Sequence, residues 1–71
     1  MRIELKKDPS GKTVKVAERI FVVSYFHGQS SCEFYTEKTE AQQRHIKLGE
    51  GNLYEILWSE AEQEYLIGNI L

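Results

Sequence analysis

Apolar and polar residues alternate in two short stretches near the beginning of the chain. Ile3 and Leu5 stand between charged neighbours, and Val14 and Val16 repeat the same spacing further on. A period of two is typical of half-buried β-strands. Residues 8–11 between the stretches read Asp-Pro-Ser-Gly, which suits a type I turn that ends in the left-handed region. The pattern therefore predicts an N-terminal β-hairpin.

The middle of the chain contains one continuous apolar stretch, Ile20–Phe26. Because nearly every position is apolar and β-forming, this stretch predicts a central strand that is covered on both faces. Turn-forming residue types follow at His27–Ser30, and alternation resumes over Ser31–Thr36. We expect the second segment to be another strand.

The segment Glu37–Leu48 has a different composition, rich in helix-forming residues. Thr39 and Gln42 have the spacing of a capping box, and Gly49 is placed to end a helix. We expect one short surface helix here. Two alternatives stay open, a long loop and a strand over Arg44–Leu48.

The last third of the chain predicts a strand at Leu53–Trp58 and has an ambiguous end. Ser59–Glu62 has a capping-box pattern that could open a terminal helix. Tyr65–Leu71 contains a glycine and β-branched residues, which favours a strand paired with Leu53–Trp58. The whole chain is thus predicted to be one small, mostly β domain, residues 1–71. We expect an antiparallel barrel-like or rolled sheet of five to six strands with at most one short helix; the alternative is an α+β fold with a C-terminal helix.

The beginning of the chain, MRIELKK…GKTVKV, resembles the first hairpin of ubiquitin-like β-grasp proteins. That family places a long helix after the second strand, whereas this chain has the apolar β stretch there. The resemblance ends at about residue 16, there is no C-terminal Gly-Gly, and no ubiquitin-like function is carried over.

Size and composition exclude several classes of protein. A chain of 71 residues buries one core and leaves no room for a deep substrate cavity inside it. Its 41% apolar residues and net charge of −2 argue against disorder. No apolar run approaches the roughly 20 residues that cross a bilayer, and no signal-peptide pattern precedes the first strand. We expect a cytoplasmic protein without a membrane partner, which the single cysteine also favours.

Catalytic and metal-binding chemistry would depend on Cys32, His27 and His45. Their spacing matches no zinc motif, and no neighbouring pattern indicates an activated thiol. Strand alternation groups Cys32 with Phe34 and Thr36, so we expect a buried cysteine. The sequence predicts no enzyme activity, no metal and no cofactor.

A protein-binding module is the function that the sequence favours. Tyr54 and Trp58 alternate onto one strand face, and tyrosine and tryptophan commonly anchor interfaces. Carboxylates border this segment, so a basic partner is expected, including a nucleic-acid-binding protein whose phosphate contacts they would occupy. Such a chain would act as a regulator or inhibitor. Inhibitors encoded by phages and mobile elements are commonly compact proteins of this kind. The predicted partner-binding residues are Tyr54, Trp58, Glu50, Glu55, Glu60 and Glu62.

The alternative is a single-stranded nucleic-acid-binding β-barrel. Residues 1–30 hold six cations and three carboxylates, whereas the rest of the chain holds three and eight. The basic half could bind phosphates while an aromatic residue stacks on bases. The overall negative charge makes nucleic acid the less favoured partner. The residues predicted for this alternative are Arg2, Lys6, Lys15, Arg19 and Tyr35.

A second copy of the chain is a further expected partner. If Tyr65–Leu71 forms an edge strand, its unpaired backbone groups favour pairing with another strand. A homodimer would add burial that a chain of this length lacks.

Overall fold

The apolar stretch in the middle of the sequence becomes the centre of the molecule. The computed structural model describes residues 1–71, and its strand β2 (Arg19–Phe26) lies between β3 (Ser30–Tyr35) and β4 (Asn52–Ser59). Ile20 and Val22 point to one face of the sheet and Val23 to the other, and all three are completely buried. The predicted central strand, covered on both faces, is confirmed over this part of β2.

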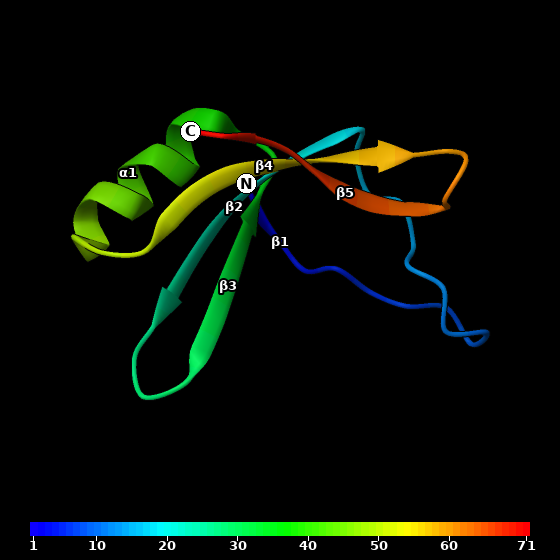
Figure 1. Cartoon of the computed structure of the whole chain (residues 1–71), viewed down its shortest axis with the longest axis horizontal. Coiled ribbons are helices and arrows are strands. Elements are labelled where there is room, and N and C mark those ends of the chain that lie inside the picture. The colour runs from blue at the N-terminus through cyan, green and yellow to red at the C-terminus, as the bar shows by residue number, and fades with distance from the viewer.

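One antiparallel sheet of five strands and one helix make up the fold (Figure 1). The strand order is β1-β3-β2-β4-β5. The sheet is open, with β1 and β5 as its edges, so the mostly β prediction is confirmed but the sheet does not close into a barrel. The remaining elements are β1 (Arg2–Ile3), α1 (Lys38–Leu48) and β5 (Glu64–Ile70).

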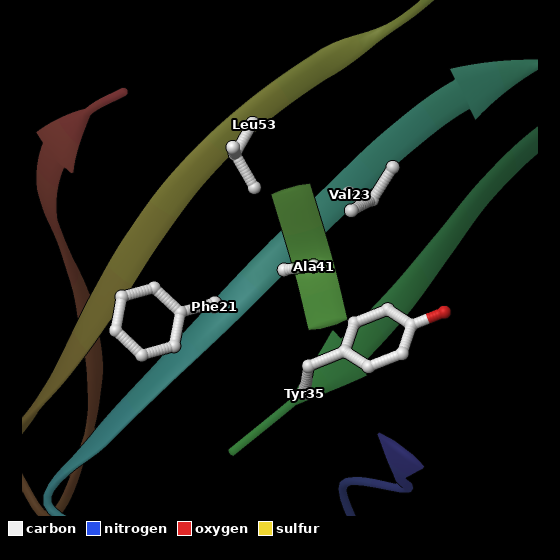
Figure 2. Packing of buried hydrophobic residues seen from close by; sticks show 5 residues of the cluster. All are labelled: Phe21, Val23, Tyr35, Ala41 and Leu53. Atoms are coloured by element: carbon white, nitrogen blue, oxygen red, sulfur yellow. The ribbon is translucent and has the colours of Figure 1, made fainter. Parts of the chain in front are cut away.

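The helix α1 covers one face of the sheet through a small side chain. Figure 2 shows Ala41 among Phe21, Val23, Tyr35 and Leu53, and Ala41 has no exposed surface. An alanine at this position lets the helix backbone approach the sheet closely. The structure therefore selects the helix prediction for this segment over the loop and the strand.

Of the two predicted ends of α1, only the C-terminal one is confirmed. Gly49 ends the helix in the left-handed conformation, with φ 71°, and its N–H donates to the carbonyls of His45 and Ile46. The predicted capping box is wrong, because the N-cap residue is Glu37 and no side chain caps the helix. Thr39 lies inside the helix instead. The helix is neither long nor apolar enough to cross a membrane.

The N-terminal arm, residues 4–18, lies on the sheet face opposite α1. Leu5 and Ala17 pack there against the cluster of Ile20, Val22 and Ile56. The predicted turn forms, since the Gly11 N–H donates to the Asp8 carbonyl at 2.9 Å.

The predicted strand around Val14 and Val16 is wrong. Only the single bridge between Lys7 and Thr13 joins the two sides of the turn. Beyond that bridge the two sides separate, because β1 pairs with β3 while the Val16 N–H donates to the Tyr65 hydroxyl at 2.9 Å. The alternating apolar residues therefore pack on the sheet from an irregular arm.

The C-terminal segment is a strand, so the alternative of a terminal helix is wrong. β5 pairs antiparallel with β4, as predicted, and a turn with Gln63 at φ 55° joins them. A bulge interrupts the ladder, because Ile67 lies opposite Ile56 whereas Ile70 lies opposite Tyr54. The bulge adds one residue to β5 and shifts its side-chain alternation.

Candidate functional site

The six predicted partner-binding residues do not form one surface. Glu55 is 5% exposed and faces α1, whereas Tyr54 and Trp58 point to the opposite sheet face. Its carboxylate accepts a hydrogen bond from the Asn69 amide and lies 3.4 Å from Arg19 Nε. Glu55 thus joins β4 to β5 and β2, and it is not available at the surface.

The two aromatic residues are half-buried and make intramolecular contacts. Trp58 packs edge-to-face on Tyr65, with ring centroids 5.0 Å apart, and its indole Nε1 is buried without a hydrogen-bond partner. Burial raises the pKa of Tyr54, and the neighbouring Cys32 thiol adds to the effect. Most of the surface of each of the two side chains is therefore covered by the protein itself.

The exposed carboxylates of the predicted set lie at opposite ends of β4. Glu50 precedes the strand, and its Oε1 lies 3.1 Å from His27 Nδ1. Glu60 and Glu62 belong to the turn that follows the strand. β4 has eight residues, so about 26 Å of strand separates the two ends. The carboxylates cannot border one common patch.

Two of the four cations predicted for the nucleic-acid alternative are paired with carboxylates. Lys15 contacts Glu18 and also Glu60, and Arg19 pairs with Glu55. These ion pairs leave two members of the set, which lie on β1 and on the N-terminal arm. The two residues that form no ion pair are Arg2 and Lys6.

Tyr35, the aromatic member of that set, is 7% exposed beneath α1. Its hydroxyl donates to Glu33 at 2.6 Å, and burial raises its pKa. The ring is therefore not available for stacking on bases.

A buried carboxylate that sequence reasoning missed lies beside Tyr35. Glu33 is 2% exposed, and each of its oxygens accepts two hydrogen bonds, one from a tyrosine hydroxyl and one from Arg44. Arg44 is the main cause of its pKa of about 2, and the hydroxyls of Tyr35 and Tyr25 add to the effect. Because both oxygens of Glu33 are occupied by donors from β2, β3 and α1, this carboxylate joins the helix to the sheet.

Cys32 is exposed, so the predicted buried cysteine is wrong. β1 pairs only with Phe34 and Tyr35, and the arm covers the opposite end of this face, so neither of them covers the part of β3 near the hairpin. His27 lies against Glu50, and His45 Nε2 lies 3.0 Å from the Gly51 carbonyl oxygen. No three His, Cys, Asp or Glu side chains come together in a group that could hold a metal ion.

Four of the ten exposed large apolar side chains lie on or just after β5. These four aliphatic side chains expose between 44% and 82% of their surface. β5 is the last strand of the sheet, so the backbone groups on its outer side pair with no other strand (Figure 1). We call this surface the β5 edge and define it by Leu66, Ile67, Ile70 and Leu71.

A groove and two carboxylates adjoin the β5 edge. At its C-terminal end an open groove of about 390 Å³ lies between Leu71 and Ile46 of α1, which is 78% exposed. At its N-terminal end Glu62 and Glu64 form no ion pair. Residues 65–71 carry no charged side chain. The edge is thus an apolar strip that begins at two carboxylates, and these line an open pocket together with Lys7 and Lys12.

Comparisons with protein-family models, with curated proteins and with solved structures found no match. The candidate function therefore comes from the surfaces of this chain alone. The β5 edge combines exposed apolar side chains with unpaired backbone groups along seven residues, whereas the other edge strand, β1, has only two.

Proposed function

We propose that this chain is a non-enzymatic protein-binding module that takes an extended segment of its partner along the β5 edge. The open strand with its exposed aliphatic side chains, 71% at Ile67 and 82% at Ile70, carries the proposal. An added strand would gain main-chain hydrogen bonds from β5 and bury these side chains. A chain that masks a partner segment in this way acts as a regulator or inhibitor.

Charge defines the chemistry of the partner segment. In an antiparallel addition, the C-terminal part of the incoming strand lies beside the beginning of β5. Glu62 and Glu64 stand there without an ion pair. The partner segment therefore has an apolar side chain at every second position, and it carries lysine or arginine toward its C-terminal end. This retains the expected basic partner and moves its binding surface from Tyr54 and Trp58 to β5.

Two further parts of the proposal concern location and nucleic acid. The protein is proposed to act in the cytoplasm, where a free cysteine such as Cys32 persists. Nucleic acid is the weaker candidate partner, because Lys15 and Arg19 are already paired with carboxylates. Phosphate binding requires cations that are free to replace counterions.

Selection from a random peptide-display library tests the proposal. We expect enriched peptides to alternate apolar residues and end with a cation. Their binding should weaken at least about tenfold in Ile67→Lys, because a cation would enter an apolar contact. Phe26→Lys is the matched control, since Phe26 is 66% exposed on the far hairpin. Absence of enrichment, or equal binding to both variants, would contradict the proposal.

A further inference from the structure

We infer that the β5 edge also binds the β5 edge of a second copy, which joins two open sheets into one. This inference rests on the proposed function of the β5 edge and names a partner for it. β5 is seven residues long, about 23 Å, and its outer side pairs with nothing in the chain. A two-fold interface uses the same patch on both copies, so the patch must be complementary to itself.

The distribution of charge sets the direction of the pairing. Glu64 begins β5, and no charged side chain follows it in the strand. A parallel pairing would place the two Glu64 carboxylates next to each other, and like charges across strands are destabilising. An antiparallel pairing separates them by most of the strand length and brings uncharged residues together. Two copies therefore meet antiparallel, about a two-fold axis.

The bulge in β5 sets the register. Tyr65 lies opposite Trp58 and Ile70 lies opposite Tyr54, so Tyr65 and Ile70 share a sheet face although they are five residues apart. Strands that pair must keep side chains of one face together. The register that sets Tyr65 opposite Ile70 of the second copy satisfies this requirement.

The same register matches the other sheet face. Leu66 lies opposite Leu57, and the Asn69 amide reaches Glu55 on that same face. Leu66 therefore stands opposite Asn69 of the second copy. The two-fold axis then falls between Ile67 and Gly68, and a residue without a side chain lies at the centre of the contact.

The burial in a single copy favours this association. Only ten residues of 71 are buried, whereas the β5 edge leaves large aliphatic side chains in water. The contact is small, because one strand pair provides less than the roughly 800 Å² per partner of a standard interface. The dimer is accordingly weak, with dissociation in the micromolar to millimolar range.

Sedimentation equilibrium of the full chain from about 10 µM to about 1 mM tests the inference. We expect a monomer–dimer equilibrium whose dissociation constant rises at least about tenfold in Ile67→Lys and in Ile70→Lys. Phe26→Lys should leave it unchanged. Circular dichroism of each variant verifies that the sheet is intact, and the second edge variant serves if the first does not fold.

A mixed sample tests the register without any substitution. Isotope-labelled and unlabelled chains are combined, and contacts between labelled and unlabelled copies are detected by filtered NMR. The inference predicts contacts between the Tyr65 ring and the Ile70 methyl groups of different copies. Within one copy these residues lie opposite Trp58 and Tyr54, four residues apart on β4.

Two results would overturn the inference, and both leave the proposed function to be judged separately. One is a chain that remains monomeric at 1 mM, in which case the bulge protects the edge from self-pairing. The other is a dimer that resists both edge variants and dissociates in Phe26→Lys. Peptide selection at concentrations where the chain is monomeric decides whether the β5 edge binds other segments.

Discussion

Arg44 on α1 and Glu33 on β3 form a two-pronged ion pair between the helix and the sheet. Nε and Nη2 of Arg44 donate to the two different carboxylate oxygens of Glu33, at 2.9 and 3.1 Å. The Tyr25 and Tyr35 hydroxyls donate to the same oxygens. The carboxylate has therefore replaced its water with four protein donors, and the guanidinium supplies its only counter-charge.

Replacing Arg44 with alanine should destabilise the fold strongly. Loss of one partner from a buried pair costs about 3–5 kcal/mol, and we expect about 2–3 kcal/mol because Arg44 is partly exposed. Urea unfolding at pH 7 measures the change in the free energy of unfolding. Lys47→Ala on the same helix, where Lys47 forms no ion pair, should change it by less than about 0.5 kcal/mol. Equal stability of the two variants would show that the pair is not required.

Acid should weaken the fold through Glu33. Its pKa is about 2 in the folded chain and ordinarily 4.5, so the folded state holds the ionised form more strongly than the unfolded state does. The resulting stability is complete above pH 4.5 and is lost as the pH falls toward 2. We expect the free energy of unfolding to decrease by at most about 3 kcal/mol over this window.

A matched variant separates Glu33 from the other carboxylates. Glu33→Gln cannot ionise, so its unfolding free energy should depend less on pH between 4.5 and 2 than that of the natural chain. The two proteins should differ most at pH 7 and approach each other near pH 2. Parallel pH profiles of the two proteins would assign the acid sensitivity to other groups.

Local patterns were sufficient to predict most strands, because each strand carries its own signal. The apolar residues of β2, the glycine that ends α1 and the β-branched residues of β5 each determine the local structure of their own segment. Pairing is different, since it depends on competition between distant segments. Residues 14–16 have the alternation of a strand, yet β1 pairs with β3 and leaves them in an irregular arm.

The surfaces were harder to predict, because alternation tells which residues share a face but not what covers that face. Tyr54 and Trp58 share one sheet face, as predicted, but the covering of both faces by α1 and the arm could not be deduced from spacing. Glu33 is buried only because Arg44 comes from the helix and Tyr25 from a neighbouring strand. No signal within β3 itself indicates that network.

The exposure of Cys32 predicts fast modification of the folded chain. Its side chain lies on the uncovered part of β3, so a thiol reagent such as Ellman's reagent should react completely without denaturant. The rate should change little when urea unfolds the chain. Protection that disappears only on unfolding would mean that the arm or a second copy covers this part of the sheet.

Gly51 should tolerate substitution far less than Gly28, although both adopt a positive φ, 90° and 76°. A Cβ at Gly28 meets nothing within 4 Å, so Gly28→Ala costs only the backbone strain, about 1 kcal/mol. A Cβ at Gly51 would overlap the Ser24 carbonyl oxygen, and the backbone of β2 cannot move aside without breaking the central ladder. We expect Gly51→Ala to cost more than about 3 kcal/mol in urea unfolding or to prevent folding. Similar losses of stability in the two variants would mean that backbone strain is the only cost, and that the beginning of β4 moves to make room for the added Cβ.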